Sequence, residues 1–361
     1  MTTTDPRGTN DGAAVGPAAA AAATASRSTV SAAKTKALGT ARTAYKNLRI
    51  SLAGRTGTRL KVAVIYGNCQ AEALLQVLKQ RAAFTQQYQL VSIPPVQSLQ
   101  PRDLHRVSAL VARADLFVTQ PVRDDYRGLP IGSEQMRAPL PEHSTVLRFP
   151  SMFFAGLHPY HAYVHATGVL GTALPLTESY HDLRHLAAAG WGLGDDAALE
   201  WLHAFVGDAG VIRALAEEGV QALAEREKSL DVGISAALQT LAWNAFHTLN
   251  HPSNEILAHV ATSVHGQVGL QSASGCPTPQ YSGPQILGFL RAPVEADVAA
   301  SLRLTVPPGY SGWTSHGQAI TADEVALAHL AWYRQHPEVV AAGLAEHRER
   351  MRELGLAAPP R

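Results

Sequence analysis

The stretch that decides the fold is Lys61-Val-Ala-Val-Ile-Tyr66, followed by the four residues Gly67-Asn68-Cys69-Gln70. A short apolar run rich in β-branched residues predicts a buried strand. The next apolar residues recur at helical spacing, and they are Ala71, Leu74, Leu75 and Leu78. The first folded unit is therefore expected to be a strand, a tight turn that holds Cys69, and a helix.

The same alternation continues along the chain. We expect further strands over residues 88–93, 115–120 and 145–149, with a helix that Pro101 opens between the first two. Strands that alternate with helices predict the α/β class, a mostly parallel sheet flanked by helices. The pattern then becomes helical over about 181–248, where Asp195 and Asp208 are expected to cap helices. Further along the chain, Thr321 and Glu324 have the spacing of a capping box ahead of another helix.

Composition divides the chain into three parts. Residues 1–56 are an alanine-rich leader and a basic linker with few bulky apolar side chains, which predicts disorder. Residues 57–265 are expected to form the α/β core with a helical insertion, and 266–361 a loop-rich segment with C-terminal helices packed on that core. A peripheral contact of residues 30–55 with anionic lipid is the alternative to a plain linker. No apolar stretch reaches the length of a transmembrane span.

Charge and cysteine content narrow the class of protein. The formal net charge of +1 gives no global field for nucleic acid, so we expect no nucleic-acid partner. The two cysteines exclude a disulfide scaffold and a four-cysteine zinc site, which favours a reducing compartment and a cytoplasmic protein. Cys276 lies in a loop without periodicity and receives no role. The sequence leaves the oligomeric state open.

Cys69 is the most informative position. A cysteine in the turn that opens a helix meets free backbone N–H groups and the positive end of the helix dipole, which favour a thiolate. Gly67 allows the backbone to approach a ligand closely, and Asn68 offers a side-chain N–H to a developing oxyanion. The alternative is a packed structural cysteine, since free cysteine is often buried.

Three segments in this order resemble the WcbI-type polysaccharide biosynthesis acetyltransferases. They are Val64-Ile-Tyr-Gly-Asn-Cys-Gln70, Phe149-Pro-Ser-Met-Phe-Phe-Ala-Gly-Leu-His-Pro159 and Asn250-His-Pro-Ser-Asn254. The resemblance implies a layout related to the SGNH hydrolases, binding of acetyl-coenzyme A, and acetylation of a sugar in a capsular or extracellular polysaccharide. It places Cys69 where the nucleophile lies, at the end of the first strand.

His251 is the best candidate for the base among sixteen histidines, because the related layout places its catalytic histidine late in the chain on such a loop. The acid that stands three residues earlier in that layout is replaced here by Thr248. Asp124, Asp125 or the Asn250 side chain is then the candidate to orient His251. In the resulting hypothesis the amides of the turn from Gly67 to Gln70, with Asn68, hold the oxyanion.

The remaining candidates follow two other strands. Loops at strand ends bind ligands in open α/β sheets. We therefore expect coenzyme A or sugar to be bound by Arg123, Asp124, Asp125 and Tyr126. Arg123 or Arg127 is expected to pair with a phosphate group of coenzyme A. Ser151 and His158 are expected to line the same site. The histidines at 158, 161, 165, 181 and 185 have metal-like spacing but lack an accompanying motif, so no metal is predicted.

Alternatives remain open at this stage. Cys69 either carries the acetyl group covalently or lies beside the thioester during direct transfer. A glycan ester hydrolase of SGNH type would use the same turn and base with water as the acceptor. A non-catalytic module that binds glycan or coenzyme A is the third reading, in which Cys69 only packs.

Overall fold

The computed structural model describes residues 60–165, 174–240, 242–270, 281, 283–308, 310 and 312–359. All of these residues belong to one compact unit, Thr58–Arg361. The predicted leader and linker, their membrane contact and Cys276 lie outside the described residues.

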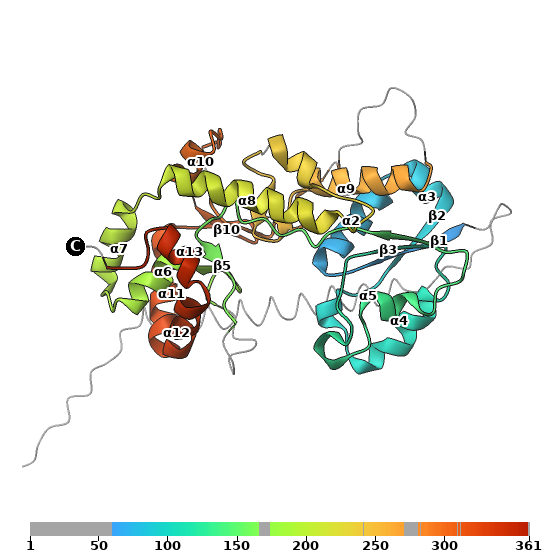
Figure 1. The fold of residues 1–361 in the computed structure, drawn as a ribbon, viewed down its shortest axis with the longest axis horizontal. Helices are drawn as coiled ribbons and strands as arrows, with labels where there is room; N and C mark the ends of the chain where they lie inside the picture. Colours follow the sequence, from blue (N-terminus) through green and yellow to red (C-terminus); the bar gives the residue numbers. More distant parts are fainter. Residues whose placement is uncertain are drawn as a thin grey trace, which may run out of the picture. The chain divides into compact units, whose positions relative to one another are not determined.

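A four-stranded sheet forms the centre of the first half of this unit (Figure 1). All its strands are parallel, in the order β2-β1-β3-β4. They are β1 (Lys61–Tyr66), β2 (Tyr88–Ser92), β3 (Leu116–Thr119) and β4 (Thr145–Arg148). Val64 of β1 pairs with Val91 on one side and Phe117 on the other. The predicted α/β class with a parallel sheet is confirmed.

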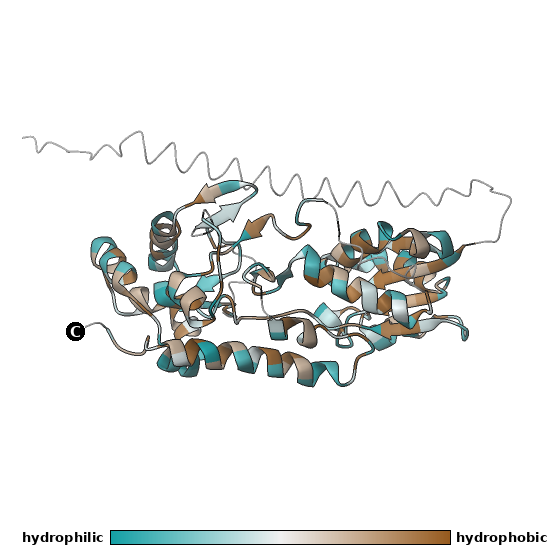
Figure 2. Cartoon of the chain, turned by 90° about the horizontal axis from the view of Figure 1, so that it is seen from above, coloured by the Kyte–Doolittle hydropathy of each residue, from teal (hydrophilic) through white to brown (hydrophobic). Residues whose placement is uncertain are grey.

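Side chains of β1 point alternately to the two faces of the sheet, and they are apolar on both faces. Both faces are therefore covered by helices. Ala63 and Ile65 pack in a core with α2 (Cys69–Lys79), α3 (Ala82–Gln87) and α9 (Asn254–Gln267). Val62, Val64 and Tyr66 pack in a second core with α4 (Leu104–Val111) and α5 (Ser133–Arg137). Figure 2 shows the strands as apolar layers between helices whose outward faces are hydrophilic.

The second half of the unit is mostly helical, with short strand pairs. Its helices are α6 (Leu183–Gly190), α7 (Asp195–Ala204), α8 (Ala209–Glu227), α10 (Ala296–Ser301), α11 (Ala322–Gln335), α12 (Pro337–Glu346) and α13 (Arg348–Glu353). The strands are β5 (His161–Ala162) with β6 (His181–Asp182), β7 (Phe246–Thr248) with β8 (His251–Pro252), and β9 (Leu290–Arg291), β10 (Trp313–Ser315) and β11 (Gln318–Ile320). Short 3-10 turns occupy Val96–Ser98, Pro101–Asp103, Tyr126–Gly128 and Ser235–Thr240. One apolar core runs from the sheet into these helices, through residues such as Leu183, Ile212 and Tyr333.

Side-chain caps fix two of the helix starts that the sequence predicts. The Asp208 carboxylate accepts hydrogen bonds from the amides of Gly210 and Val211, and Thr321 with Glu324 closes the predicted capping box. The prediction that Asp195 caps a helix is wrong, since Gly194 is the capping residue and Asp195 begins α7, where its charge suits the helix dipole. Among the described residues, no helix is long and apolar enough to cross a membrane.

Candidate active site

The turn after β1 meets the end of β3 at the carboxyl edge of the sheet. This is where the strand order reverses, the usual ligand-binding position in open α/β sheets. A Cβ atom at Gly67 would lie 2.3 Å from the Gln120 side-chain oxygen, so only glycine fits there. The Asn68 amide donates to that same oxygen at 2.9 Å, and Asn68 Oδ1 caps α2 by accepting from the Gln70 amide. The turn is thus held by Gln120.

Beneath the turn lies a group that we call the amide junction, formed by the Gln70 and Gln120 side chains and the peptide groups of Met152 and Asn250. Gln70 is fully buried. Its Nε2 donates to the carbonyls of Met152 (2.7 Å) and Asn250 (2.8 Å). Its Oε1 accepts from the Met152 amide (2.9 Å) and from Gln120 Nε2 (2.7 Å). Every hydrogen-bonding position of this side chain is filled.

The amide junction has two consequences for the predicted site. It brings the segment around Asn250, and with it the backbone next to His251, to the turn that carries Cys69. It also uses the whole Gln70 side chain and, through Asn68, the Gln70 amide. The Asn68 amide is likewise engaged, by Gln120. The oxyanion role predicted for the 67–70 turn is therefore restricted to the Cys69 amide and the Asn68 side-chain NH₂.

Cys69 is the first residue of α2 and is partly buried. Burial raises the pKa of its thiol to about 11, and the carboxylates of Glu72 and Glu178 add to the shift. The backbone amides of Cys69 and Gln70 favour the thiolate and oppose this rise in pKa only in part. The prediction that this helix start favours a thiolate is therefore wrong for the resting protein, because desolvation outweighs the amide and dipole effects.

His251 begins β8, opposite Thr248 of β7, and is buried. Burial lowers the pKa of its imidazole to about 4, and the nearby His247 lowers it further, so the ring is neutral at physiological pH. Its Nδ1 is buried and has no hydrogen-bond partner among the described residues. We call Cys69 and His251 the candidate catalytic pair, since burial holds both side chains uncharged.

Two tyrosines connect the surroundings of this pair. Burial raises the pKa of the Tyr163 hydroxyl to about 12, and both Tyr180 and Cys69 influence it. The Tyr163 and Tyr180 ring centres are 5.4 Å apart. The Tyr180 hydroxyl donates to Asn250 Oδ1 at 2.6 Å and accepts from Thr248. Its ring meets the His251 ring edge to face at 6.0 Å. Aromatic contacts thus extend from the Cys69 side to His251.

The orienting partners predicted for His251 are not found in those positions. The Asn250 side chain accepts from Tyr180, and Asp125 accepts from the Gln135 side chain at 2.8 Å. Asp124 packs against Gly132, where an added Cβ would meet its carboxylate. Burial and the neighbouring His247 lower the pKa of His251, and neither aspartate contributes to this shift. These side chains are engaged in fixing the loop after β3 instead.

The other predicted residues are divided between surface and interior. Arg123 is exposed, with its guanidinium 6.0 Å from the centre of the Tyr126 ring. Ser151 is exposed between Pro150 and Met152, which both hydrogen-bond the amide junction. His158 is buried, and its ring nitrogens contact the carbonyls of Pro293 (3.1 Å) and Phe246 (3.3 Å). His158 is thus a packed interior residue, and burial lowers its pKa to about 4.

Sequence reasoning missed Gln120, Tyr163, Glu178 and Tyr180. Gln120 carried a usable signal, because it directly follows β3, the neighbour of β1, and the carboxyl ends of parallel strands share one edge. The segment of Glu178 and Tyr180 carried none, since its place beside Cys69 follows from long-range packing. Glu178 has a left-handed φ of 59°, a conformation rarely adopted by residues other than glycine. Across the described ranges, no cluster of three or more histidines, cysteines and acids is arranged to hold a metal ion.

Sheet, turn and histidine hairpin together define an α/β protein with a thiol-bearing site at the carboxyl edge of a parallel sheet. The family model described as "Polysaccharide biosynthesis enzyme WcbI" matches residues 62–273. The chain therefore belongs to the WcbI family of polysaccharide biosynthesis enzymes, which confirms the resemblance seen in the sequence.

A solved structure shares this fold, with a TM-score of 0.71 and 20% sequence identity, covering 83% of this chain and 100% of that one. It is described as WcbI, a novel polysaccharide biosynthesis enzyme, the native protein without a disulfide bond between coenzyme A and one of its cysteines. No curated protein sequence matches the chain.

Proposed function

We propose that this protein transfers an acetyl group from acetyl-coenzyme A to a sugar hydroxyl during biosynthesis of a capsular or extracellular polysaccharide. The observation that carries the proposal is the amide junction, through which Gln70 ties the Cys69 turn to the peptide before His251. Family membership supports the polysaccharide pathway. The description of the solved WcbI structure, which mentions coenzyme A and a cysteine, supports the thioester donor.

The proposed chemistry uses the candidate catalytic pair in its uncharged form. Neutral His251 takes the proton of the acceptor hydroxyl as the oxygen attacks the acetyl carbonyl carbon. A carbon–oxygen bond forms, the carbon–sulfur bond breaks, and the proton passes from His251 to the departing sulfur of coenzyme A. The Cys69 amide and the Asn68 side chain stabilise the oxyanion on the way. The lowered pKa leaves His251 unprotonated at neutral pH, which is the form that a base requires.

Cys69 acts in this proposal beside the thioester, and direct transfer is preferred to an acyl-cysteine. With a thiol pKa of about 11, only about one molecule in 10⁴ carries a thiolate at pH 7. A covalent route would have to recover that factor when substrate binds. Intact-mass measurement after mixing with acetyl-coenzyme A decides between the routes, because a covalent route leaves an acetyl adduct that Cys69→Ala abolishes.

The loop after β3 supplies the proposed contact with the phosphates of coenzyme A. Arg123 is exposed there, and a guanidinium matches the geometry of phosphate oxygens. Asp125 and Gln135 hold the loop in place through their hydrogen bond. Tyr126 supports the Arg123 side chain by its ring face. Ser151, exposed between Pro150 and Met152, is proposed to line the same site.

Calorimetric titration with coenzyme A tests the proposed function. We expect one molecule to bind per chain, and Gly67→Ala to weaken binding because its new Cβ would displace the Gln120 side chain. A glycan ester hydrolase has no reason to bind coenzyme A. If the folded wild-type protein does not bind coenzyme A, the proposed transferase activity is contradicted and the glycan ester hydrolase is favoured.

A further inference from the structure

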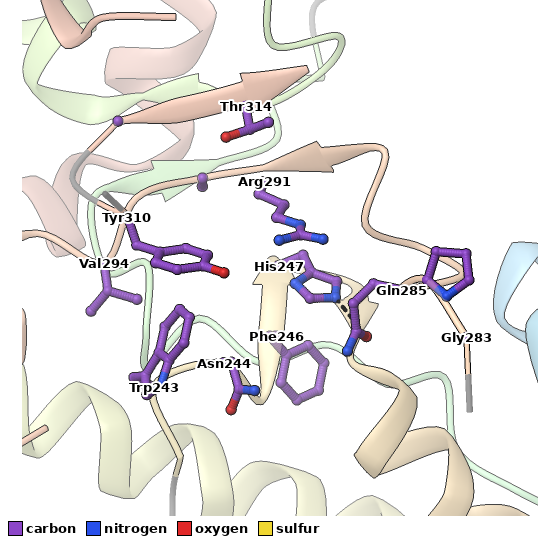
Figure 3. A pocket seen from close by; sticks show the side chains of 13 residues that line it. Trp243, Asn244, Phe246, His247, Gly283, Gln285, Arg291, Val294, Tyr310 and Thr314 are labelled. Atoms are coloured by element: carbon purple, nitrogen blue, oxygen red, sulfur yellow. Dashed lines mark hydrogen bonds between the residues drawn. The ribbon is translucent and has the colours of Figure 1, made fainter. Parts of the chain in front are cut away.

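A cavity opens beside the β7–β8 hairpin, and Phe246 and His247 of β7 form part of its lining. It has a volume of about 320 Å³, within the range of small-molecule sites. Figure 3 shows side chains from four separate segments that point into it. The aromatic, polar and charged residues of the lining include Trp243, Asn244, His247, Gln285, Arg291 and Tyr310. None of the residues that line the cavity is Asp or Glu.

Trp243 and Tyr310 form one wall of the cavity. Their ring centres are 4.5 Å apart and their planes differ by 62°. Because the two rings contact each other edge to face, they do not leave a parallel slot for a flat purine. A bent aromatic wall instead suits the C–H face of a pyranose ring, which packs on an aromatic surface while its hydroxyls point elsewhere.

Polar groups face this wall. The His247 ring hydrogen-bonds Gln285 Oε1 at 3.1 Å, and that oxygen also accepts from the Asn254 amide. Gln285 and Asn244 both line the cavity and add amide groups to it (Figure 3). Hydroxyl groups of a sugar match such a set of mixed donors and acceptors. The fixed position of Gln285 gives this side of the cavity a defined hydrogen-bonding geometry.

Arg291 supplies a positive charge to the cavity. Its Nε donates to the Gly288 carbonyl at 3.2 Å, which orients the guanidinium while its terminal nitrogens point inward (Figure 3). In the described part of the chain, Arg291 makes no ion pair. A guanidinium in a cavity without acidic neighbours favours a ligand that carries an anionic group.

The cavity adjoins the β7–β8 hairpin, which carries His251. His247, which lines it, belongs to the hairpin that carries His251, and the two imidazoles influence each other electrostatically. The Ala292 amide donates to the His247 carbonyl at 2.8 Å, which fixes Arg291 next to that hairpin. A ligand in the cavity therefore contacts β7, the strand paired with the one that holds the proposed base, His251.

We propose that this cavity is the acceptor subsite, and that it binds a pyranose with an anionic substituent such as the carboxylate of a uronic acid. The assignment as acceptor rests on the proposed function, whereas binding of the acidic sugar does not. Trp243 and Tyr310 hold the ring, Gln285 and Asn244 bind its hydroxyls, and Arg291 pairs with the anion.

Binding of methyl β-D-glucuronide and methyl β-D-glucoside to the full chain tests this subsite, followed by saturation-transfer NMR and by tryptophan fluorescence. We expect the glucuronide to bind and Arg291→Gln to weaken it about tenfold or more, because a charge-assisted hydrogen bond is lost. Arg291→Lys should retain part of the affinity. Binding of the glucoside should be weak and insensitive to Arg291→Gln, and Trp243→Ala should weaken both ligands. Arg213→Gln, at an exposed arginine on α8, is the matched control.

Three outcomes overturn the proposal. The first is absence of glucuronide binding to a wild-type protein whose thermal unfolding is normal. The second is glucuronide affinity that Arg291→Gln leaves unchanged. The third is displacement of the glucuronide by adenosine 3′,5′-bisphosphate with the same sensitivity to Arg291→Gln, which would assign the cavity to the nucleotide end of coenzyme A. If coenzyme A fails to bind while the glucuronide binds as expected, the subsite stands and the proposed transferase falls.

Discussion

The amide junction and the candidate catalytic pair, Cys69 and His251, are adjacent along the chain but differ in how completely their buried polar atoms are hydrogen-bonded. All four hydrogen-bonding positions of Gln70 are filled, although its side chain is completely buried. One residue earlier, the thiol of Cys69 is held protonated by burial. Across the junction, His251 has a buried nitrogen without a partner among the described residues.

This difference distinguishes buried polar groups that stabilise the fold from buried polar groups that are candidates for chemistry. A satisfied buried network fixes its segments relative to one another, whereas an unsatisfied buried group costs free energy that folding must offset elsewhere. Such costly groups concentrate where chemistry occurs. The junction thus fixes the backbone next to Cys69 and next to His251, while the side chains of these two residues take no part in its hydrogen bonds.

The largest expected effect comes from breaking the junction. Gln70→Leu should lower the free energy of unfolding by about 3–5 kcal/mol, because it leaves the polar groups of Met152, Asn250 and Gln120 buried without partners. Urea unfolding measures this change. Gln76→Leu, at an exposed position of the same helix, should stay within about 0.5 kcal/mol of wild type. Equal losses for both variants would contradict the role of the junction.

The pH dependence of Cys69 alkylation examines the other side of the comparison. A thiol pKa raised from 9.0 to about 11 means less thiolate at every pH below the shifted value. In a Cys276→Ser background, iodoacetamide should react at pH 8 about 100-fold more slowly than with a free thiol. The rate should still rise about tenfold per pH unit up to pH 9.5. A rate that levels off below pH 9 would mean that the turn activates the thiol.

Gly67→Ala sharpens the contact between junction and turn. Its Cβ would lie 2.3 Å from the Gln120 oxygen that also binds the Asn68 amide. We expect a loss of about 1–3 kcal/mol in the free energy of unfolding, the usual cost of overpacking. Gly266→Ala is the control, because nothing lies within 4 Å of its added Cβ and its helical position favours alanine. Thermal unfolding of both variants gives the answer, and an unchanged Gly67→Ala would show that the turn is not tightly held.

The smallest effect is expected at the loop after β3. Arg123→Gln should weaken coenzyme A binding only about two- to fivefold at low salt, because exposed ion pairs are screened by solvent. Calorimetry at two salt concentrations measures it, with Arg113→Gln as the control at another exposed arginine. A loss of a hundredfold would place Arg123 in a desolvated site, and no loss would remove it from the cofactor contact.

Local patterns in the sequence predicted the sheet well, because β1, the turn and α2 follow from a β-branched run, a glycine and a helical period. The same patterns could not predict the junction. Gln70 meets Met152 and Asn250, which lie 82 and 180 residues further along the chain, and no periodicity encodes such pairs.

The electrostatic predictions failed for the same reason. Local sequence shows that Cys69 opens a helix, and this alone favours a thiolate. Burial, which reverses the sign of the pKa shift, depends on segments such as that of Glu178, far along the chain. His158 likewise resembled a site residue in its motif, and long-range packing against Pro293 makes it an interior one.

The central claim is that His251 acts as the base in acetyl transfer beside the Cys69 turn. Transfer of radiolabelled acetyl from acetyl-coenzyme A to de-O-acetylated polysaccharide of the source organism tests it most directly. We predict that His251→Gln lowers the transfer rate about 100-fold or more while the dissociation constant of coenzyme A stays within about threefold. Transfer by His251→Gln at the wild-type rate would contradict the account.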